Sequence, residues 1–98
     1  SACIRLFAEK FPAAFDRNRT QPLKIDIHRD AFDRIDDVSR KAIRRALSVW
    51  TRQPDYLRAV AAQGAIRVDL DGNPAGPVAD AERIFAQARL GEEGSGNE

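Results

Sequence analysis

Residues that carry common metal and redox chemistry are scarce in this chain of 98 residues. It holds one cysteine, Cys3, one histidine, His28, and no methionine. A single cysteine cannot close a disulfide within the chain, so we expect a reducing, cytoplasmic location. One histidine with no cysteine nearby lacks the spacing of a metal site. We therefore expect no metal and no other cofactor.

Sequence signals for catalysis are also missing. We find no phosphate-binding loop, zinc motif or nucleophile elbow. Asp69 and Asp71 form a close pair of carboxylates, but they flank Asp71-Gly72, a strong hairpin signal in which acidic residues serve the turn itself. The sequence therefore predicts a protein that is not an enzyme and has no small-molecule substrate.

Long apolar runs are absent as well. No uncharged apolar stretch approaches the roughly 20 residues of a membrane span, and no signal-peptide pattern is present. The length suits one domain, and 43% hydrophobic with 32% charged residues predicts a modest core. We expect a monomer without membrane contact. Because the first residue is Ser1 rather than methionine, we expect a trimmed or processed start with flanking segments missing.

Acidic residues are scarcest in the middle of the chain. Residues 38–67 hold seven Lys or Arg against a single acid, Asp55. Residues 1–37 balance at seven against seven, and residues 68–98 hold two bases against seven acids. The net charge of +1 is thus an average over a basic middle and an acidic end. Such asymmetry predicts an anionic partner for the middle segment.

The hydrophobic pattern predicts a small, mostly helical α+β domain with one short β-hairpin. The helical spacing of Ile4, Phe7 and Phe11 predicts a helix over residues 3–11 that ends before Pro12. Alternation in PLKIDIH predicts a half-buried strand or extended segment. The remaining expected elements are a short helix over 30–36, a helix capped by Ser39, a helix from Pro54 to near Gly64, a hairpin around Asp71-Gly72, and a last helix capped by Asp80.

These elements would form one domain over residues 1–90, followed by a mobile acidic tail over residues 91–98. Several of them are expected to bury apolar side chains in a shared core. The expected inward residues are Phe32 and Ile35 of the short helix, Ile66, Val68 and Leu70 of the hairpin, and Ile84, Phe85 and Ala88 of the last helix.

The helix after Ser39 is the most informative segment. At about 100° per residue, its apolar side chains fall on one arc and its bases on the other. Arg40 and Arg44 are like charges at i,i+4, as are Lys41 and Arg45, and each such pair costs a few tenths of a kcal/mol. A solvated face normally mixes signs, so an anionic partner explains this pattern best. The apolar arc is Ala42, Ile43, Ala46, Leu47, Val49 and Trp50, and the basic arc is Arg40, Lys41, Arg44, Arg45, Ser48 and Arg52.

Three further residues are candidates for the same surface. Lys24 is the one base in PLKIDIH, and Arg67 is expected opposite Ile66 and Val68 on the hairpin. Tyr56 falls in the first turn of the helix that starts at Pro54, where free backbone N–H groups favour phosphate. A tyrosine there can stack on a base or bind a sugar or phosphate. Alternatively, it is a half-buried core tyrosine with its hydroxyl at the surface.

Four blocks of the sequence together resemble a known family. PLKIDIH, SRKAIRRALSVWT, YL and RVDLDGNPAG occur in the order and spacing of the ProQ/FinO-domain RNA chaperones of bacteria, and the similarity covers roughly residues 3–90. The resemblance implies a small RNA-binding domain that recognises structured small RNAs and mRNA 3′ terminator hairpins with a U-rich 3′ tail. It also implies a role in post-transcriptional regulation, by binding small RNAs or by promoting RNA pairing.

The family's RNA-binding face would fall on Lys24, Arg40, Arg44, Tyr56 and Arg67. Thr51 matches the start of the pocket segment that receives the RNA 3′ end. With the rest of the basic arc, the predicted RNA-binding residues are Lys24, Arg40, Lys41, Arg44, Arg45, Thr51, Arg52, Tyr56 and Arg67. The bases would contact stem phosphates, so the stem would be recognised by shape, and the pocket beside Tyr56 would hold the last nucleotides.

The sequence departs from the family pattern at several places. Ser48 stands where relatives can have another arginine, and Trp50 where a tyrosine is common, as a core substitution. Asp55 in the first turn of the pocket helix suits the helix dipole but would repel a terminal phosphate. We therefore expect a neutral 3′-hydroxyl end as the ligand. The acidic tail would compete with RNA for the arginines or remain solvated.

Other interpretations of the basic helix remain open. Residues 39–63 would suit a DNA-binding helix-turn-helix, but the arginines lie on the first helix and not on the one that would enter the groove. The basic helix could instead dock on an acidic protein partner. That alternative predicts a stoichiometric protein complex and RNA binding that vanishes at physiological salt.

Overall fold

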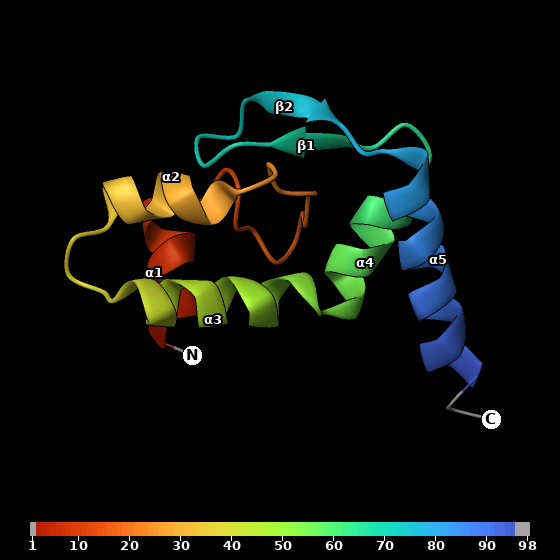
Figure 1. Cartoon of the computed structure of the whole chain (residues 1–98), viewed down its shortest axis with the longest axis horizontal. Helices are drawn as coiled ribbons and strands as arrows, with labels where there is room; N and C mark the ends of the chain where they lie inside the picture. The colour runs from red at the N-terminus through yellow and green to blue at the C-terminus, as the bar shows by residue number, and fades with distance from the viewer. Residues whose placement is uncertain (1, 96–98) are drawn as a thin grey trace.

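The computed structural model describes residues 2–95. A long helix, α3 (Arg40–Thr51), runs along one side of the molecule, opposite the β-hairpin (Figure 1). Within these residues the chain forms five helices and a two-stranded antiparallel sheet. The mostly helical α+β class expected from the sequence is therefore confirmed. The elements are α1 (Ala2–Lys10), α2 (Ile27–Arg34), α3 (Arg40–Thr51), α4 (Pro54–Ala61), β1 (Ile66–Val68), β2 (Pro74–Pro77) and α5 (Asp80–Ser95).

An aromatic cluster between α1 and α3 forms the centre of the core. Phe7 and Phe15 stack with ring centroids 5.0 Å apart, and Phe15 meets Trp50 edge-on at 5.4 Å. These rings and Ile43 are almost completely buried. Trp50 is thus a core residue, as its place on the apolar arc predicted. This cluster fixes α3 on α1 and leaves the opposite face of α3 free for function.

Helix α3 begins where the sequence predicts. The Ser39 hydroxyl accepts a hydrogen bond from the backbone N–H of Ala42 at 3.1 Å, which supplies a partner to a first-turn donor. Ala46, Leu47 and Trp50 are buried as expected. Val49 is an exception, because 46% of it is exposed. It lies at the edge of the apolar arc, beyond the reach of the core.

The segment PLKIDIH is not the strand that its alternation suggests. Leu23 makes a single parallel bridge to Val68, and the chain then turns at Asp26, whose φ of 63° is left-handed. Aspartate tolerates this conformation better than most residues. The turn lets α2 start at Ile27, so Ile25 is 62% exposed while Ile27 is buried on a helix. Of the three apolar residues that alternate in this segment, Leu23 and Ile27 are thus buried, and Ile25 is not.

Helix α2 therefore begins three residues before the expected short helix over 30–36 and ends at Arg34. Ile35, just past its end, is buried as predicted, whereas Phe32 is only partly buried against the core. Phe32 thus keeps one side of its ring available to neighbouring side chains.

The hairpin turn confirms that Asp69 serves backbone geometry. Its carboxylate accepts from the backbone N–H groups of Asp71 and Asn73, both at 2.9 Å. The hydrogen bond from Asn73 holds the pKa of Asp69 below its ordinary value. Asp71 pairs with Arg34 on α2 at 3.1 Å. The two acids are therefore occupied in closing the turn and attaching it to α2.

The inward face of the hairpin differs from the prediction. The register is irregular between Ile66 and Val68, as at a β-bulge, which re-aims side chains. Ile66 is 48% exposed, while Arg67 and Val68 are both buried. Alternation along three residues placed Arg67 outward, and the irregular register reverses that placement. Leu70 is buried, as predicted.

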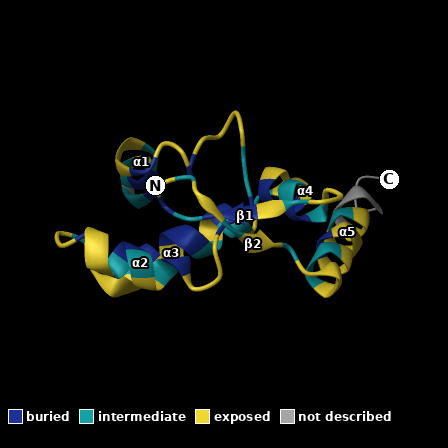
Figure 2. Ribbon diagram, turned by 90° about the horizontal axis from the view of Figure 1, so that it is seen from above, coloured by how far each residue is buried: buried dark blue, intermediate teal, exposed yellow. Residues whose placement is uncertain are grey.

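Helix α5 buries much less than its sequence suggests. Ile84 and Phe85 are 57% and 61% exposed, Ala88 is exposed, and Ala86 is buried instead. The helix lies beside α4 at the end of the molecule, and its surface in Figure 2 is largely exposed. Because α4 covers only one side of this helix, a narrow stripe of apolar side chains is enough to form the contact. Asp80 is its first residue rather than its cap, and Glu82 instead accepts from the Ala79 backbone N–H.

The predicted domain boundary after residue 90 does not coincide with a structural boundary. Helix α5 continues through Ser95, and so includes residues 91–95 of the segment predicted as a tail. Residues 96–98 lie outside the described part of the chain. No helix within the described residues is long and apolar enough to cross a membrane.

Candidate nucleic-acid interface

A polar pocket of about 420 Å³ lies where α2, α3, α4 and β1 meet. Leu23, Lys24 and Asp26 come from the turn before α2, Leu47 and Thr51 lie on α3, and Tyr56 lies on α4. The backbone N–H of Lys24 donates to the Val68 carbonyl oxygen, and the Val68 N–H donates to the Pro22 carbonyl oxygen, so this turn is held against β1. The residues lining the pocket are Leu23, Lys24, Asp26, Ile27, His28, Arg44, Leu47, Ser48, Thr51, Tyr56 and Arg67.

Five of the predicted RNA-binding residues meet in this pocket. They are separated by up to 43 positions in the sequence and come from four elements or turns, so their convergence is a tertiary result. These residues are Lys24, Arg44, Thr51, Tyr56 and Arg67. The remaining four predicted residues, Arg40, Lys41, Arg45 and Arg52, are exposed and do not line it.

Arg40 and Arg44 share one aromatic partner. Their guanidinium carbons lie 5.0 Å and 5.4 Å from the centroid of the Phe32 ring. Such cation–π contacts are worth roughly 0.5–1 kcal/mol at exposed sites, which offsets the repulsion between these two like charges. This contact was not predicted, because Phe32 was expected in the core.

Lys41 and Arg45 on α3 and Arg52 at its C-cap form a second stripe, about 100° around the helix from Arg40, Arg44 and Thr51. Among the described side chains, none of these three bases is joined to an acid by an ion pair. Lys41 and Arg45 thus keep the uncompensated like-charge pairing that the sequence indicated.

Lys24 stands at the rim of the pocket and already has an acidic partner. Its ammonium donates to the Asp30 carboxylate at 2.8 Å, and this contact raises the pKa of Lys24. Both side chains are partly exposed. An incoming phosphate would therefore share Lys24 with Asp30 rather than find an unpaired charge.

Arg67 does not lie on the surface as predicted. Its side chain is only 9% exposed, and its guanidinium donates to the Leu23 carbonyl oxygen at 2.7 Å and to the Glu82 carboxylate. These two bonds connect β1 to the turn before α2 and to α5. Arg67 therefore holds the pocket wall, and its predicted outward placement on the hairpin is wrong.

Tyr56 is also more enclosed than expected. It is 8% exposed, and its hydroxyl oxygen accepts from the Leu23 backbone N–H at 3.0 Å. The ring is thus no open stacking platform, although Tyr56 does line the pocket. Asp55 lies in the same turn, and its carboxylate forms an ion pair with Arg58 at 2.6 Å.

Sequence reasoning missed Asp26 and His28 as polar residues of the pocket, and it placed Ser48 on the basic arc without predicting that it lines a pocket. Asp26 and His28 line it because the left-handed turn at Asp26 places the start of α2 beside α3. Ser48 lines it too, one turn from Arg44, and its carbonyl oxygen accepts from the Thr51 hydroxyl at 3.3 Å. No local signal could have shown this, since each residue reads alone as a surface or turn residue.

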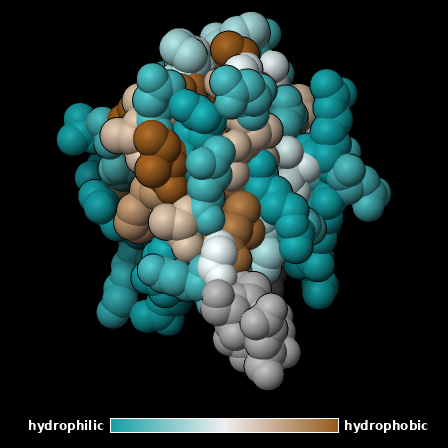
Figure 3. Space-filling model, turned by 90° about the vertical axis from the view of Figure 1, so that its right-hand side faces the viewer, coloured by the Kyte–Doolittle hydropathy of each residue, from teal (hydrophilic) through white to brown (hydrophobic). Residues whose placement is uncertain are grey.

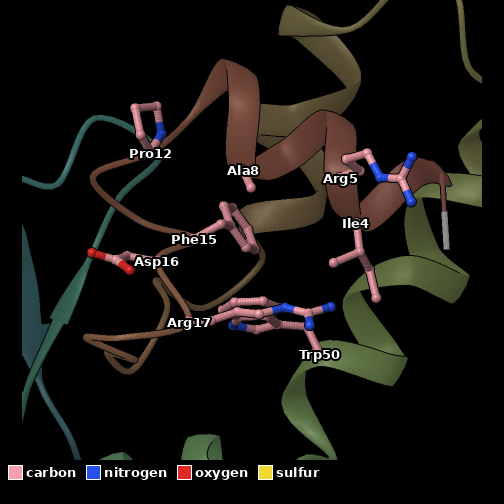
Figure 4. Close-up of a pocket in the computed structure, with 8 residues that line it drawn as sticks. All are labelled: Ile4, Arg5, Ala8, Pro12, Phe15, Asp16, Arg17 and Trp50. Carbon is pink, nitrogen blue, oxygen red and sulfur yellow. The ribbon is translucent and has the colours of Figure 1, made fainter.

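A second cavity of about 470 Å³ has a different composition and lies between α1, the loop after it and α3 (Figure 4). Figure 4 shows Ile4, Phe15 and Trp50 around it. None of the predicted RNA-binding residues lines this cavity. Arg5 and Arg17 line it together with Asp16, so neither size nor charge alone separates the two cavities. The pocket beside Tyr56 is the better candidate because five of the predicted RNA-binding residues meet there.

The sequence matches the model of the ProQ/FINO family over residues 1–98. The chain belongs to this family. The match covers all the elements that build the pocket of this ProQ/FINO domain. The resemblance carried by PLKIDIH and RVDLDGNPAG is thereby confirmed.

Two relatives that are similar in sequence support the same family assignment. The domain is 40% identical over 96 residues to the RNA chaperone ProQ of Shewanella amazonensis, and 42% identical over 92 residues to the RNA chaperone ProQ of Haemophilus influenzae. These matches cover 94% and 90% of this chain, but only 43% and 46% of the relatives. The chain thus spans less than half of their length.

Solved structures share the fold of this ProQ/FINO domain. The crystal structure of a FinO-like RNA chaperone from Neisseria meningitidis has a TM-score of 0.78 at 29% identity, covering 88% of this chain and 73% of that one. The solution structure of a ProQ homolog from Legionella pneumophila has a TM-score of 0.70 at 33% identity, covering 92% and 79%.

Proposed function

We propose that this chain is an RNA-binding domain that recognises structured RNAs, in particular hairpins that end in a single-stranded, U-rich 3′ tail. One observation carries the proposal: the polar pocket beside Tyr56 adjoins the exposed basic face of α3. The bases of α3 would contact phosphates of the stem, and the pocket would take the last nucleotide. The names of the relatives, RNA chaperones, support an RNA partner.

The charges in the pocket favour a 3′-hydroxyl over a 3′-phosphate. Lys24 pairs with Asp30, Arg67 pairs with Glu82, and the Asp26 carboxylate lines the pocket as well. Arg44 is then the pocket cation without an acidic partner among the described residues. One such cation suits one backbone phosphate, whereas a terminal phosphate would add charge for which the described residues that line the pocket offer no further unpaired base.

The first prediction concerns the RNA end. A short hairpin with a 3′ oligo-U tail should bind about tenfold more tightly with a free hydroxyl than with a 3′-phosphate, a difference of about 1.4 kcal/mol. Titrations of both RNAs near physiological salt measure this. Equal binding would leave a nonspecific polyanion surface, and binding of neither RNA would favour an acidic protein partner.

The second prediction concerns Arg44. Replacing it with alanine should weaken binding of many hairpin RNAs to a similar extent and reduce the slope of log K against log salt by about 1, as expected for one lost phosphate contact. Arg5→Ala removes the same charge from α1, beside the other cavity, and is the matched control. An Arg44→Ala variant that keeps the full salt slope would contradict the assignment.

A further inference from the structure

A third cavity, also of about 420 Å³, adjoins the proposed 3′-end pocket. It lies between α4 and α5, and it shares Thr51, Tyr56 and Arg67 with the first pocket. The two cavities are therefore neighbours on either side of the same wall. The residues lining the third cavity are Thr51, Tyr56, Leu57, Val60, Arg67, Ala81, Glu82, Phe85 and Ala86.

The chemistry of this cavity differs from that of the first. Leu57, Val60 and Ala86 make its walls apolar, and its one base, Arg67, is paired with Glu82. A phosphate would find no free cation here and would approach a carboxylate. A flat, uncharged ring would instead find apolar walls, so the cavity suits a nucleotide base better than the backbone beside it.

Phe85 gives the cavity an open aromatic side. It is 61% exposed, and the guanidinium carbon of Arg89, one turn later, lies 5.9 Å from its ring centroid. The small, buried Ala86 faces α4, which brings α5 close and sets Phe85 at the edge of the contact. Hydrophobic side chains are visible among polar ones on this side of the molecule in Figure 3. An exposed phenylalanine beside an arginine is a stacking platform for bases of single-stranded RNA.

We infer that the cavity between α4 and α5 is a second subsite, which binds a base of the single-stranded 3′ tail by stacking it on Phe85. The inference rests on the proposed function, since the tail reaches this subsite from the 3′-end pocket across the shared wall of Tyr56 and Arg67. Recognition by stacking tolerates any base. The subsite would therefore select for an unpaired tail of sufficient length rather than for a sequence.

The test combines protein and RNA changes. Phe85→Ala should weaken binding of the U-tailed hairpin about 5- to 10-fold, as for the loss of a stacked base. Phe85→Trp should restore it. Ile84→Ala is the matched control, because Ile84 is 57% exposed on the same helix but does not line the cavity. A series of RNAs, each lacking one base of the tail, identifies the position whose base stacks on Phe85. With the RNA that lacks that base, Phe85→Ala should cause no further loss of binding affinity.

The possible results separate the two proposals. If the wild-type protein discriminates the 3′-hydroxyl from the 3′-phosphate while Phe85→Ala binds every RNA like the wild type, the subsite is wrong and the proposed function stands. If the wild-type protein does not discriminate, both proposals fall. If Phe85→Ala leaves RNA affinity unchanged but lowers the sedimenting mass, Phe85 belongs to a contact between protein copies, and the subsite is again wrong.

Discussion

Replacing Arg67 with alanine is expected to lower the free energy of unfolding by about 2–3 kcal/mol. The substitution removes two charged hydrogen bonds and leaves the Leu23 carbonyl oxygen without its donor in the interior. Glu82 is 42% exposed, so water can take over part of its solvation, and the loss stays below the 3–5 kcal/mol seen for fully buried pairs. Chemical denaturation followed by circular dichroism measures the change.

Arg58→Ala provides the control for this prediction. Arg58 pairs with Asp55, but both side chains are 64% exposed, and such surface pairs contribute about 0–1 kcal/mol. If Arg67 contacted phosphate from the surface, its replacement would weaken RNA binding and leave stability as in Arg58→Ala. An unchanged unfolding midpoint for Arg67→Ala would therefore support the outward placement of Arg67 that was predicted from the sequence.

Replacing Gly72 with alanine is expected to lower the free energy of unfolding by about 2–5 kcal/mol, for two separate reasons. Its φ is +83°, a left-handed conformation that costs residues with a Cβ roughly 1–2 kcal/mol. In addition, the new Cβ would lie 2.7 Å from the Cβ of Ala13, and overpacking of this kind costs about 1–3 kcal/mol. The hairpin turn would have to move away from the loop after α1.

Gly64→Ala separates the two costs. Gly64 also has a positive φ, +72°, but no atom lies within 4 Å of the Cβ position. It should therefore lose only about 1–2 kcal/mol. Combining Ala13→Gly with Gly72→Ala should recover part of the stability lost at Gly72. Equal losses for the two glycine variants would mean that the turn does not approach Ala13 in solution.

The helices that pack on the core were predictable from the sequence. Residues 3–11 and the Ser39 cap could be located because helix periodicity and capping depend on neighbours within one or two turns. The Asp71-Gly72 turn was predictable for the same reason. Of the candidate site, sequence reasoning found the basic face of α3 and five residues that line the pocket, through local periodicity or the family resemblance. They are Lys24, Arg44, Thr51, Tyr56 and Arg67, although the enclosure of the last two was not predicted.

Other features depended on single residues whose effect is not local. The left-handed turn at Asp26 interrupts an alternation that otherwise reads as a strand, and it brings His28 into the pocket. Phe85 fits an inward position by helical spacing, yet it is exposed because α5 packs mainly along α4 and, among the elements described, meets β1 only through the bond between Glu82 and Arg67. Periodicity shows that a helix has an apolar stripe, but not how wide a surface its neighbours will cover.

Local sequence patterns place most helices and the hairpin turn, and they show which face of α3 is basic and that the middle of the chain lacks acids to balance it. The burial of Arg67, and the positions of Tyr56 and Phe85 beside adjoining cavities, follow instead from packing between distant segments. Arg67 donates to the carbonyl oxygen of Leu23, 44 residues earlier, and to Glu82, 15 residues later. Whether a charged side chain is enclosed or solvated depends on partners at such distances, because burial is tolerated only where those partners satisfy its hydrogen bonds.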